Sequence, residues 1–226
     1  YRISVSDQSI REFLKSEDYR FSDISFSPDG KWMLVSGQKT DDRAFNQSLF
    51  IEETLESIKN QGYPNLEVFI IDNGSKDNTR QKISHWLESS KPTFQFFTTY
   101  RNETLPYCQS FNLAFLKSKG KFLIDLSGDD VLLPGHISTS VTKLQQSIGA
   151  ACCFSDVLMV YSNGKKKTFY KRTPEGHLNQ KVKIGDVYSN LVERNIISSV
   201  SLVFDASIFT KVGGYDESLA YEDFDI

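Results

Sequence analysis

The sequence has little of what marks disulfide-rich, membrane-spanning or nucleic-acid-binding proteins. Its 226 residues include three cysteines, Cys108, Cys152 and Cys153, an odd number with two adjacent in an apolar run, which argues against a disulfide framework or a zinc site. No apolar run approaches the roughly 20 residues of a membrane span, and no secretory signal pattern opens the chain. The net charge of −3 offers nucleic acid no general attraction. We therefore expect reduced core cysteines, a cytoplasmic location and no nucleic-acid partner.

A glycine-rich phosphate loop bearing a lysine is also missing before the first recognisable helix, which argues against a nucleotidyltransferase or another enzyme built on such a loop. Hydrophobic residues make up 39% of the chain, enough to fill one large domain, or one domain with an extension. What the chain does contain is a series of short apolar runs, each ending in a polar or acidic loop.

One of these runs, made by Phe122, Leu123, Ile124 and Leu126, breaks at Ser127-Gly128 and is followed at once by Asp129 and Asp130. The pattern predicts a buried strand with two carboxylates at its C-terminal end, after which Pro134 opens a helix. Open α/β sheets bind ligands at that edge, and two carboxylates beside a flexible glycine suit a Mg²⁺ or Mn²⁺ ion that also takes phosphate oxygens. The plainer interpretation is that the acids cap the next helix and solubilise a turn.

A similar strand and loop lie earlier in the chain. An apolar face at helical spacing begins at Phe50 and stops at Gly62, and the run 66–71, apolar except for Glu67, predicts a strand buried on both faces. The polar loop that follows contains Asp72 and Asn73, which we expect to face a ligand, and a helix near 77–88 comes next.

The alternation of helix and strand continues to residue 130. A strand over 93–100, a helix ending at Gly120 and the strand at Phe122 complete it, and this order predicts an α/β fold with a mostly parallel central sheet and helices on both faces. The loops after parallel strands meet at one edge of a sheet. Asp72 and Asp129 should therefore lie near each other.

The second half predicts a different mixture of elements. A helix over 137–148 is followed by a hairpin within 150–172 whose turn is Asn163-Gly164, and then by a helix over 183–195, a strand over 198–205 and a short helix that glycines end. Five basic residues on the hairpin favour either an anionic acceptor or membrane surface, or a solvated face: Lys165, Lys166, Lys167, Lys171 and Arg172.

The chain closes on acids set among aromatic residues after a double glycine. Such acids can have raised pKa values and act as bases, or they can solvate a terminal helix, and the pattern alone favours neither. They are Asp216, Glu217, Glu222, Asp223 and Asp225.

Residues 1–44 differ in sequence pattern from the rest of the chain. FSDISF, SPDG and KWMLVSG predict two strands joined by a Pro-Asp-Gly turn, locally similar to part of a β-propeller blade. No second copy follows at a fixed period, so a propeller is not supported. We expect an N-terminal hairpin extension packed on the main sheet, followed by one domain over 45–226.

Four stretches, taken in order, resemble the inverting family 2 glycosyltransferases of the GT-A fold: FNQSLFIEETLESIKNQ, YPNLEVFIIDNGSKDNT, GKFLIDLSGDDVLLPG and VGGYDESLAYEDFDI. The resemblance spans residues 45–226. It implies transfer of a sugar from a nucleotide-diphosphate sugar, UDP- or dTDP-linked, to a hydroxyl of a glycan or lipid-linked acceptor, in polysaccharide or cell-surface glycan synthesis. It also implies a Mn²⁺ or Mg²⁺ cofactor and peripheral association with the inner face of the membrane.

The resemblance assigns roles residue by residue. Asp72 and Asn73 match the loop that holds the donor nucleotide. Asp129 matches the metal-binding acid of the D-x-D motif and Asp130 the donor-side acid after it. In the C-terminal motif, Asp223 matches the general base and Glu222 its neighbour.

Three departures accompany the resemblance. Ser127 stands where many relatives have the first acid of D-x-D. The first family strand is not recognisable before Phe45-Asn46, so either Trp32 to Val35 supplies it or the nucleotide pocket lacks a wall. The chain stops just after Asp223 where relatives continue, so we expect a C-terminal truncation. The alternative function is a non-catalytic interaction module with a glycosyltransferase-like core.

Overall fold

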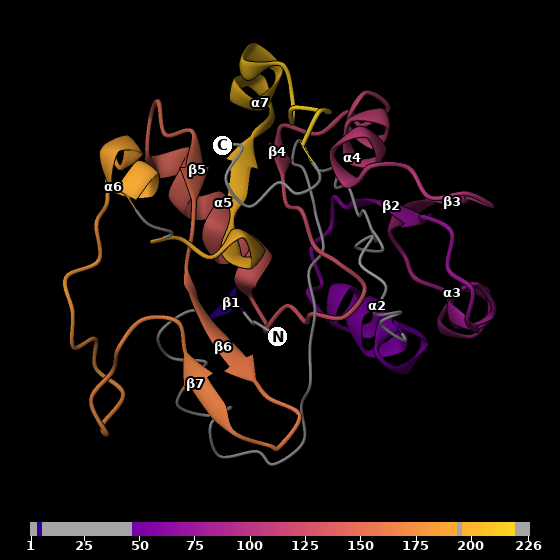
Figure 1. Cartoon of the computed structure of the whole chain (residues 1–226), viewed down its shortest axis with the longest axis horizontal. Coiled ribbons are helices and arrows are strands. Elements are labelled where there is room, and N and C mark those ends of the chain that lie inside the picture. The colour runs from indigo at the N-terminus through magenta and orange to yellow at the C-terminus, as the bar shows by residue number, and fades with distance from the viewer. Residues whose placement is uncertain (1–3, 6–46, 194–195, 220–226) are drawn as a thin grey trace.

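In the computed structural model, residues 4–5, 47–193 and 196–219 are described (Figure 1). The hairpin expected within residues 1–44 and the acids Glu222, Asp223 and Asp225 lie outside these ranges. The described chain contains helices and short strands in the alternating order that the sequence predicts for residues 50–130, and a mixture of the two thereafter.

The first half contains the predicted alternation of helix and strand. Apolar residues at helical spacing form α2, and the largely apolar run forms β2, all of whose residues, Glu67 and Asp72 included, are buried. The elements are η1 (Gln47–Leu49), α2 (Ile51–Lys59), β2 (Glu67–Asp72), α3 (Thr79–Ser90), β3 (Gln95–Tyr100), α4 (Tyr107–Phe115) and β4 (Phe122–Leu123).

The second half departs more from expectation. The turn at Asn163-Gly164 is where it was predicted, but Cys152–Cys153 is a separate strand, and the helix expected over 183–195 is confined to a few residues. The elements are α5 (His136–Gln146), β5 (Cys152–Cys153), β6 (Asp156–Val160), β7 (Lys166–Thr168), α6 (Tyr188–Glu193), η2 (Ser199–Ser201), β8 (Val203–Asp205) and α7 (Ala206–Val212).

Three sheets are present in the described residues. β2 and β3 pair in parallel, from Glu67 opposite Gln95 to Asp72 opposite Tyr100. β4, β8 and β5 form an antiparallel sheet with β8 in the middle, and β1 (Ser4–Val5), β6 and β7 form another. This mixed α/β architecture confirms the predicted fold class, although parallel pairing in the described part of the chain is confined to β2 and β3.

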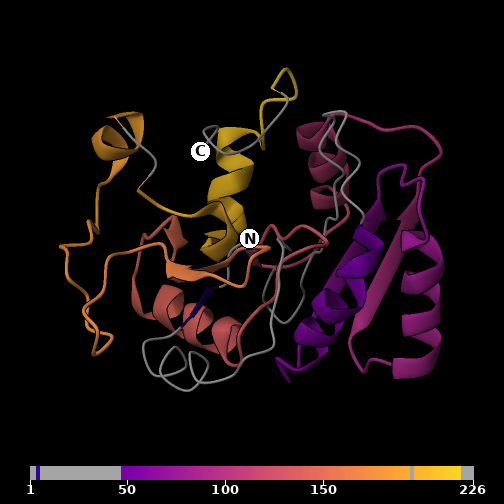
Figure 2. The same ribbon diagram turned by 60° about the horizontal axis from the view of Figure 1, so that its bottom comes forward.

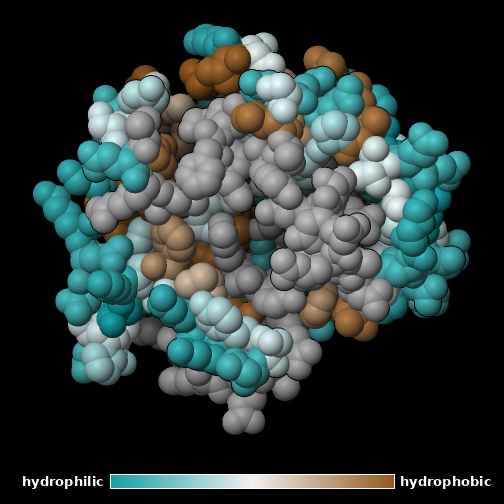
Figure 3. Space-filling model, in the orientation of Figure 1, coloured by the Kyte–Doolittle hydropathy of each residue, from teal (hydrophilic) through white to brown (hydrophobic). Residues whose placement is uncertain are grey.

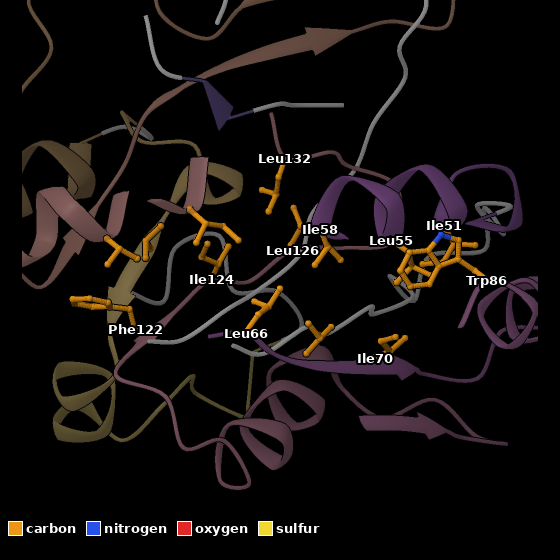
Figure 4. Packing of buried hydrophobic residues seen from close by; sticks show 14 of the residues in the cluster. Ile51, Leu55, Ile58, Leu66, Ile70, Trp86, Phe122, Ile124, Leu126 and Leu132 are labelled. Carbon is orange, nitrogen blue, oxygen red and sulfur yellow. The ribbon is translucent and has the colours of Figure 1, made fainter. Parts of the chain in front are cut away.

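Two hydrophobic cores lie on opposite faces of the strands. Val68 and Ile70 of β2 join a core made with α2, α3 and α5, whereas Phe69 and Ile71 join a core made with α4 and α7. β4 and β8 divide their side chains in the same way, because successive residues of a strand point to opposite faces. Figure 4 shows the first core, and Figure 2 shows α5 low in the view with α4 and α7 high. The helices on both faces agree with the sequence prediction.

The surface above the second core is partly apolar. Leu113 and Leu116 at the end of α4 and Val212 at the end of α7 are exposed. Hydrophobic side chains accordingly reach the surface at the top of the view in Figure 3, over these two helices. No helix in the described ranges is both long enough and apolar enough to cross a membrane.

The cysteines are core residues, as predicted. Cys152 packs against the second core and Cys153 against the first, which explains why their strand pairs with β8 at the centre of the molecule and not with the distal hairpin. None of the three forms a disulfide. Burial, with a smaller contribution from neighbouring Cys153, raises the pKa of the Cys152 thiol to about 11, so it is protonated at neutral pH.

His136, the first residue of α5, should make stability depend on pH. It is buried, and burial lowers its pKa to about 4. The unfolded chain binds a proton near pH 6.5, so acid favours the unfolded state, and we expect the free energy of unfolding to fall by about 3 kcal/mol as the pH falls from about 6.5 to about 4. Urea unfolding across that window measures the fall. His136→Gln should flatten it whatever its absolute stability, and an equally steep fall in that variant would contradict the assignment.

Candidate functional site

The acidic loop after β4 is held by one polar side of α2. The hydroxyl of Thr54 donates to the backbone oxygens of Gly128 (3.3 Å) and Asp130 (3.0 Å). The hydroxyl of Ser57 accepts from the backbone N–H of Leu132 (3.2 Å). These two helix residues are three apart, so they lie on the same side of α2. They fix the loop through its main chain.

Gln61, two residues after the end of α2, continues this row of contacts. The Gln61 amide nitrogen donates to the backbone oxygens of Leu132 (3.3 Å) and Leu133 (3.0 Å), and its oxygen accepts from the N–H of Ile137 (3.3 Å) in the first turn of α5. We call Thr54, Ser57 and Gln61 the α2 clamp. Because it spans the loop from residue 128 to the start of α5, it holds the acids between the two helices.

The two predicted carboxylates differ in exposure. Asp129 is half-buried, whereas Asp130 is 2% exposed. In the described residues, no three side chains of His, Cys, Asp or Glu gather in the way a protein-only metal site needs. Within the described ranges, the loop after β4 carries these two carboxylates.

The loop after β2 is held by its own polar side chains. Asp72 is buried, accepts from the N–H of Ser75 (2.9 Å) and forms an ion pair with Arg80 of α3. Asn73, also buried, donates from its amide to the backbone oxygen of Leu105 (2.8 Å) and accepts from the N–H of the same residue (3.1 Å). Both side chains thus have partners within the chain, and their predicted contact with a donor stays a prediction.

A buried acid that sequence reasoning did not select lies inside the strand predicted over 122–126. Asp125 is 8% exposed, and its carboxylate accepts from the hydroxyls of Tyr107 on α4 and of Tyr215 after α7 (3.1 Å to the latter). A strand over 122–126 was expected, but the pairing of β4 ends at Leu123, two residues before this acid. Asp125 instead joins two segments 108 residues apart in the chain, from Tyr107 to Tyr215.

The segment after α7 has a second anchor on α4. The amide nitrogen of Asn112 donates to the backbone oxygen of Tyr215 (2.8 Å) and to the Glu217 carboxylate (3.1 Å), and its oxygen accepts from the N–H of Tyr215 (3.0 Å). The ring of Tyr215 packs against Phe111 and Phe209, with centroids 4.8 Å and 5.1 Å away. The stretch that leads towards Glu222 and Asp223 therefore starts from a fixed position.

These contacts converge on the start of α4. The loop after β2 is bonded to Leu105, two residues before Tyr107, and Tyr107 is bonded to Asp125, which is bonded in turn to Tyr215. Asp125 precedes Asp129 by four residues. The structure thus connects the loop of Asp72, the stretch that leads to Asp129 and the stretch that leads to the C-terminal acids, while the C-terminal acids Glu222 and Asp223 themselves lie beyond the described ranges.

The family model of glycosyl transferase family 2 matches residues 44–197, well over half of the chain. The chain belongs to glycosyl transferase family 2. An uncharacterized glycosyltransferase of Haemophilus influenzae is 27% identical over 72% of this chain and 46% of its own length. The GalNAc(5)-diNAcBac-PP-undecaprenol beta-1,3-glucosyltransferase of Campylobacter jejuni is 27% identical over 55% of this chain and 39% of its own length. This family 2 chain spans about half the length, or less, of these curated relatives.

Solved structures agree on the fold. A mannosyltransferase of Pyrobaculum calidifontis, in complex with GDP-Man and Mn²⁺, superimposes with a TM-score of 0.56 at 16% identity, covering 96% of this chain and 56% of that one. S. aureus TarS in complex with UDP gives a TM-score of 0.55 at 14% identity, covering 85% and 52%. The family 2 chain therefore has the GT-A architecture that its motifs predicted.

Sequence reasoning missed the residues that position the site, because most of them are polar residues that do not stand out from the other residues of their helices. Thr54 and Ser57 on α2 and Gln61 just after it recur at spacings of three and four, and this recurrence was the available signal. Asn112 and Asp125 gave no local signal, since the partners of Asn112 are more than a hundred residues away and those of Asp125 are 18 and 90 residues away.

Gly214 tests the anchor on α4. Gly213 and Gly214 both have positive φ (+93° and +83°), so alanine at either costs about 1–2 kcal/mol. A Cβ on Gly213 would meet no atom within 4 Å, whereas one on Gly214 would lie 2.7 Å from the Asn112 side-chain oxygen. We expect Gly214→Ala to lower the free energy of unfolding by roughly 1–3 kcal/mol more than Gly213→Ala, because Asn112 must give up its bonds to Tyr215. Urea denaturation of both variants measures the difference, and equal losses would contradict it.

Proposed function

We propose that this chain transfers a sugar from a nucleotide-diphosphate donor to an acceptor hydroxyl, with inversion at the anomeric carbon. The observation that supports this most is the convergence at the start of α4. Hydrogen bonds there connect the loop of Asp72, the stretch before Asp129 and the stretch that leads to Asp223. An inverting transfer needs donor and acceptor groups at one place, because the attacking oxygen and the leaving group react in one step on opposite faces of the sugar.

Asp129, with Asp130 beside it, is the proposed holder of a Mn²⁺ or Mg²⁺ ion. Such ions are commonly bound through one or two carboxylates, with phosphate and water oxygens completing the shell, so a site on Asp129 does not need a third protein ligand. The bound ion would neutralise charge that develops on the leaving nucleoside diphosphate. The α2 clamp keeps the loop that carries these acids in place through its main chain.

Asp223 is the proposed general base. Its carboxylate takes the proton of the acceptor hydroxyl as that oxygen bonds to the anomeric carbon, while the bond from this carbon to the diphosphate oxygen breaks. Glu222 is the proposed neighbour that shapes the acceptor side. Asp72 and Asn73 hold the loop whose backbone would line the donor pocket.

The donor and acceptor classes are proposed from the relatives. The solved neighbours hold GDP-Man or UDP, which supports a nucleotide-diphosphate sugar, and we propose a UDP- or dTDP-linked one. The Campylobacter jejuni relative is named for an undecaprenol-linked acceptor, which supports a glycan or lipid-linked acceptor, met by peripheral association with a membrane.

Ligand-dependent melting tests the proposal. The melting temperature is measured with UDP, dTDP or GDP, each with Mn²⁺ and with EDTA. At a hundredfold excess over Kd, the preferred nucleotide should raise it by roughly 5 °C or more, and EDTA should remove the rise. If no nucleotide raises it with Mn²⁺, the proposal fails and a non-catalytic interaction module is the better description.

A further inference from the structure

The outer edge of β3 has no partner strand in the described part of the chain. The N–H of Gln95 donates to Leu66 O (3.2 Å), and the N–H of Arg101 to Asp72 O (2.9 Å), so the odd-numbered residues of β3 face β2. Backbone groups alternate along a strand, so the N–H and C=O groups of Phe96, Thr98 and Tyr100 point the other way. Figure 1 shows β3 at the rim, with β2 on its inner side. These groups are available for another strand.

Within the residues that the structure describes, the edge also lacks the features that usually prevent pairing. Natural edge strands carry a lysine, a proline, a bulge or a covering segment. β3 reads QFFTTY, without a charge or a proline, and pairs with β2 without a bulge over its whole length. Phe96, Phe97 and Tyr100 are all nearly 40% exposed. The strand therefore combines exposed aromatic side chains with a regular backbone edge, and both favour pairing with another strand.

We propose that two copies of this chain pair antiparallel through β3, about a two-fold axis at Thr98, to form a continuous sheet of β2, β3 and their copies. Thr98 then lies opposite Thr98 of the second copy, Phe96 opposite Tyr100, and Phe97 opposite Thr99. Threonine pairs, aromatic pairs and aromatic-to-threonine pairs are the types that stabilise cross-strand contacts. The inference goes beyond sugar transfer and does not depend on it.

Backbone geometry and charge both favour this register. The residues whose N–H and C=O groups point outward fall opposite one another, so each such pair exchanges two hydrogen bonds. Arg101 falls opposite Gln95, so no like charges meet across the edge. Tyr100 is already ordered by a contact between its hydroxyl and that of Ser84 (3.3 Å) and by Arg80, 5.9 Å from the ring centroid, which lowers the entropy cost of pairing. Because the partner strand is a second copy of β3, one sequence provides both sides of these contacts.

Sedimentation equilibrium of the 226-residue chain tests the pairing. We expect a dimer, and we expect Thr98→Lys, which places two ammonium groups at the axis, to weaken it at least tenfold. Gln145→Lys adds the same charge on the exposed side of α5 and should leave the dimer intact. A chain that is monomeric at every concentration, or a dimer that Thr98→Lys does not weaken, would overturn the proposal.

A cysteine cross-link tests the register. Directly opposed, hydrogen-bonded residues of antiparallel strands have Cα atoms about 5.5 Å apart, which suits a disulfide. Thr98→Cys should give a disulfide-linked dimer in oxidised glutathione, whereas the unaltered chain and Thr99→Cys, which falls opposite Phe97, should not. Equal cross-linking at both positions, or heterogeneous larger species, would count against the register.

Discussion

Replacing Asp129 with asparagine is expected to abolish metal-dependent nucleotide binding and to lower sugar transfer about a thousandfold. Asparagine keeps the shape of the side chain and one oxygen but removes the negative charge that a hard divalent ion requires. The bonds from Thr54 and Ser57 reach only main-chain atoms of this loop, so the melting temperature without ligand should change little. The rise in melting temperature with nucleotide and Mn²⁺, together with the transfer rate, measures the effect.

The control is the same change of carboxylate to amide far from the site. Glu88→Gln, on the exposed side of α3, should retain both the melting response and transfer. If the Mn²⁺-dependent rise survives in Asp129→Asn, the ion is held elsewhere and the assignment of this acid is wrong.

Asp223→Asn is expected to separate chemistry from binding. An amide cannot take the acceptor's proton, so kcat should fall by about 10²–10⁴, the usual contribution of a positioned base. The melting response to nucleotide and Mn²⁺ should persist, because the donor side is unaltered. Initial rates at saturating donor, set beside the melting data, distinguish this outcome from the loss of both properties in Asp129→Asn.

Asp216→Asn is the matched control in the same acidic segment. Asp216 accepts from the N–H of Ser218 (2.8 Å), a bond that an asparagine oxygen can also accept. Its kcat should stay close to that of the unaltered chain. If kcat of Asp223→Asn stays within tenfold of that of the unaltered chain, Asp223 is not the general base, and Glu222 becomes the next candidate.

Much of the fold could be predicted because its signals are local. The run 66–71 is apolar except for Glu67, a pattern that favours a strand covered on both faces, and β2 forms within one residue of it. The asparagine and glycine at residues 163–164 predicted the hairpin turn because the turn itself selects them. Cys152 and Cys153 were placed in the wrong pairing, since strand β8 that they join lies some fifty residues later and leaves no trace in local pattern.

The site was predictable only in part for a related reason. Asp129 and Asp130 stand out because acids directly follow an apolar run. The residues that hold them do not, because Thr54 and Ser57 look like ordinary polar helix positions and Asp125 looks like an interruption of a strand. These residues matter through hydrogen bonds to residues distant in the sequence, and only the three-dimensional structure shows which residues those are.

The α2 clamp has a consequence for how such a chain can diverge. It grips carbonyl oxygens and N–H groups that every amino acid except proline supplies in full, so substitutions among Ser127, Asp129 and Asp130 leave those bonds in place. The loop can thus change its ligand preference, or lose it, while these main-chain bonds to α2 remain. Related chains can then acquire a different preference for the sugar donor while the main-chain bonds that hold this loop stay the same.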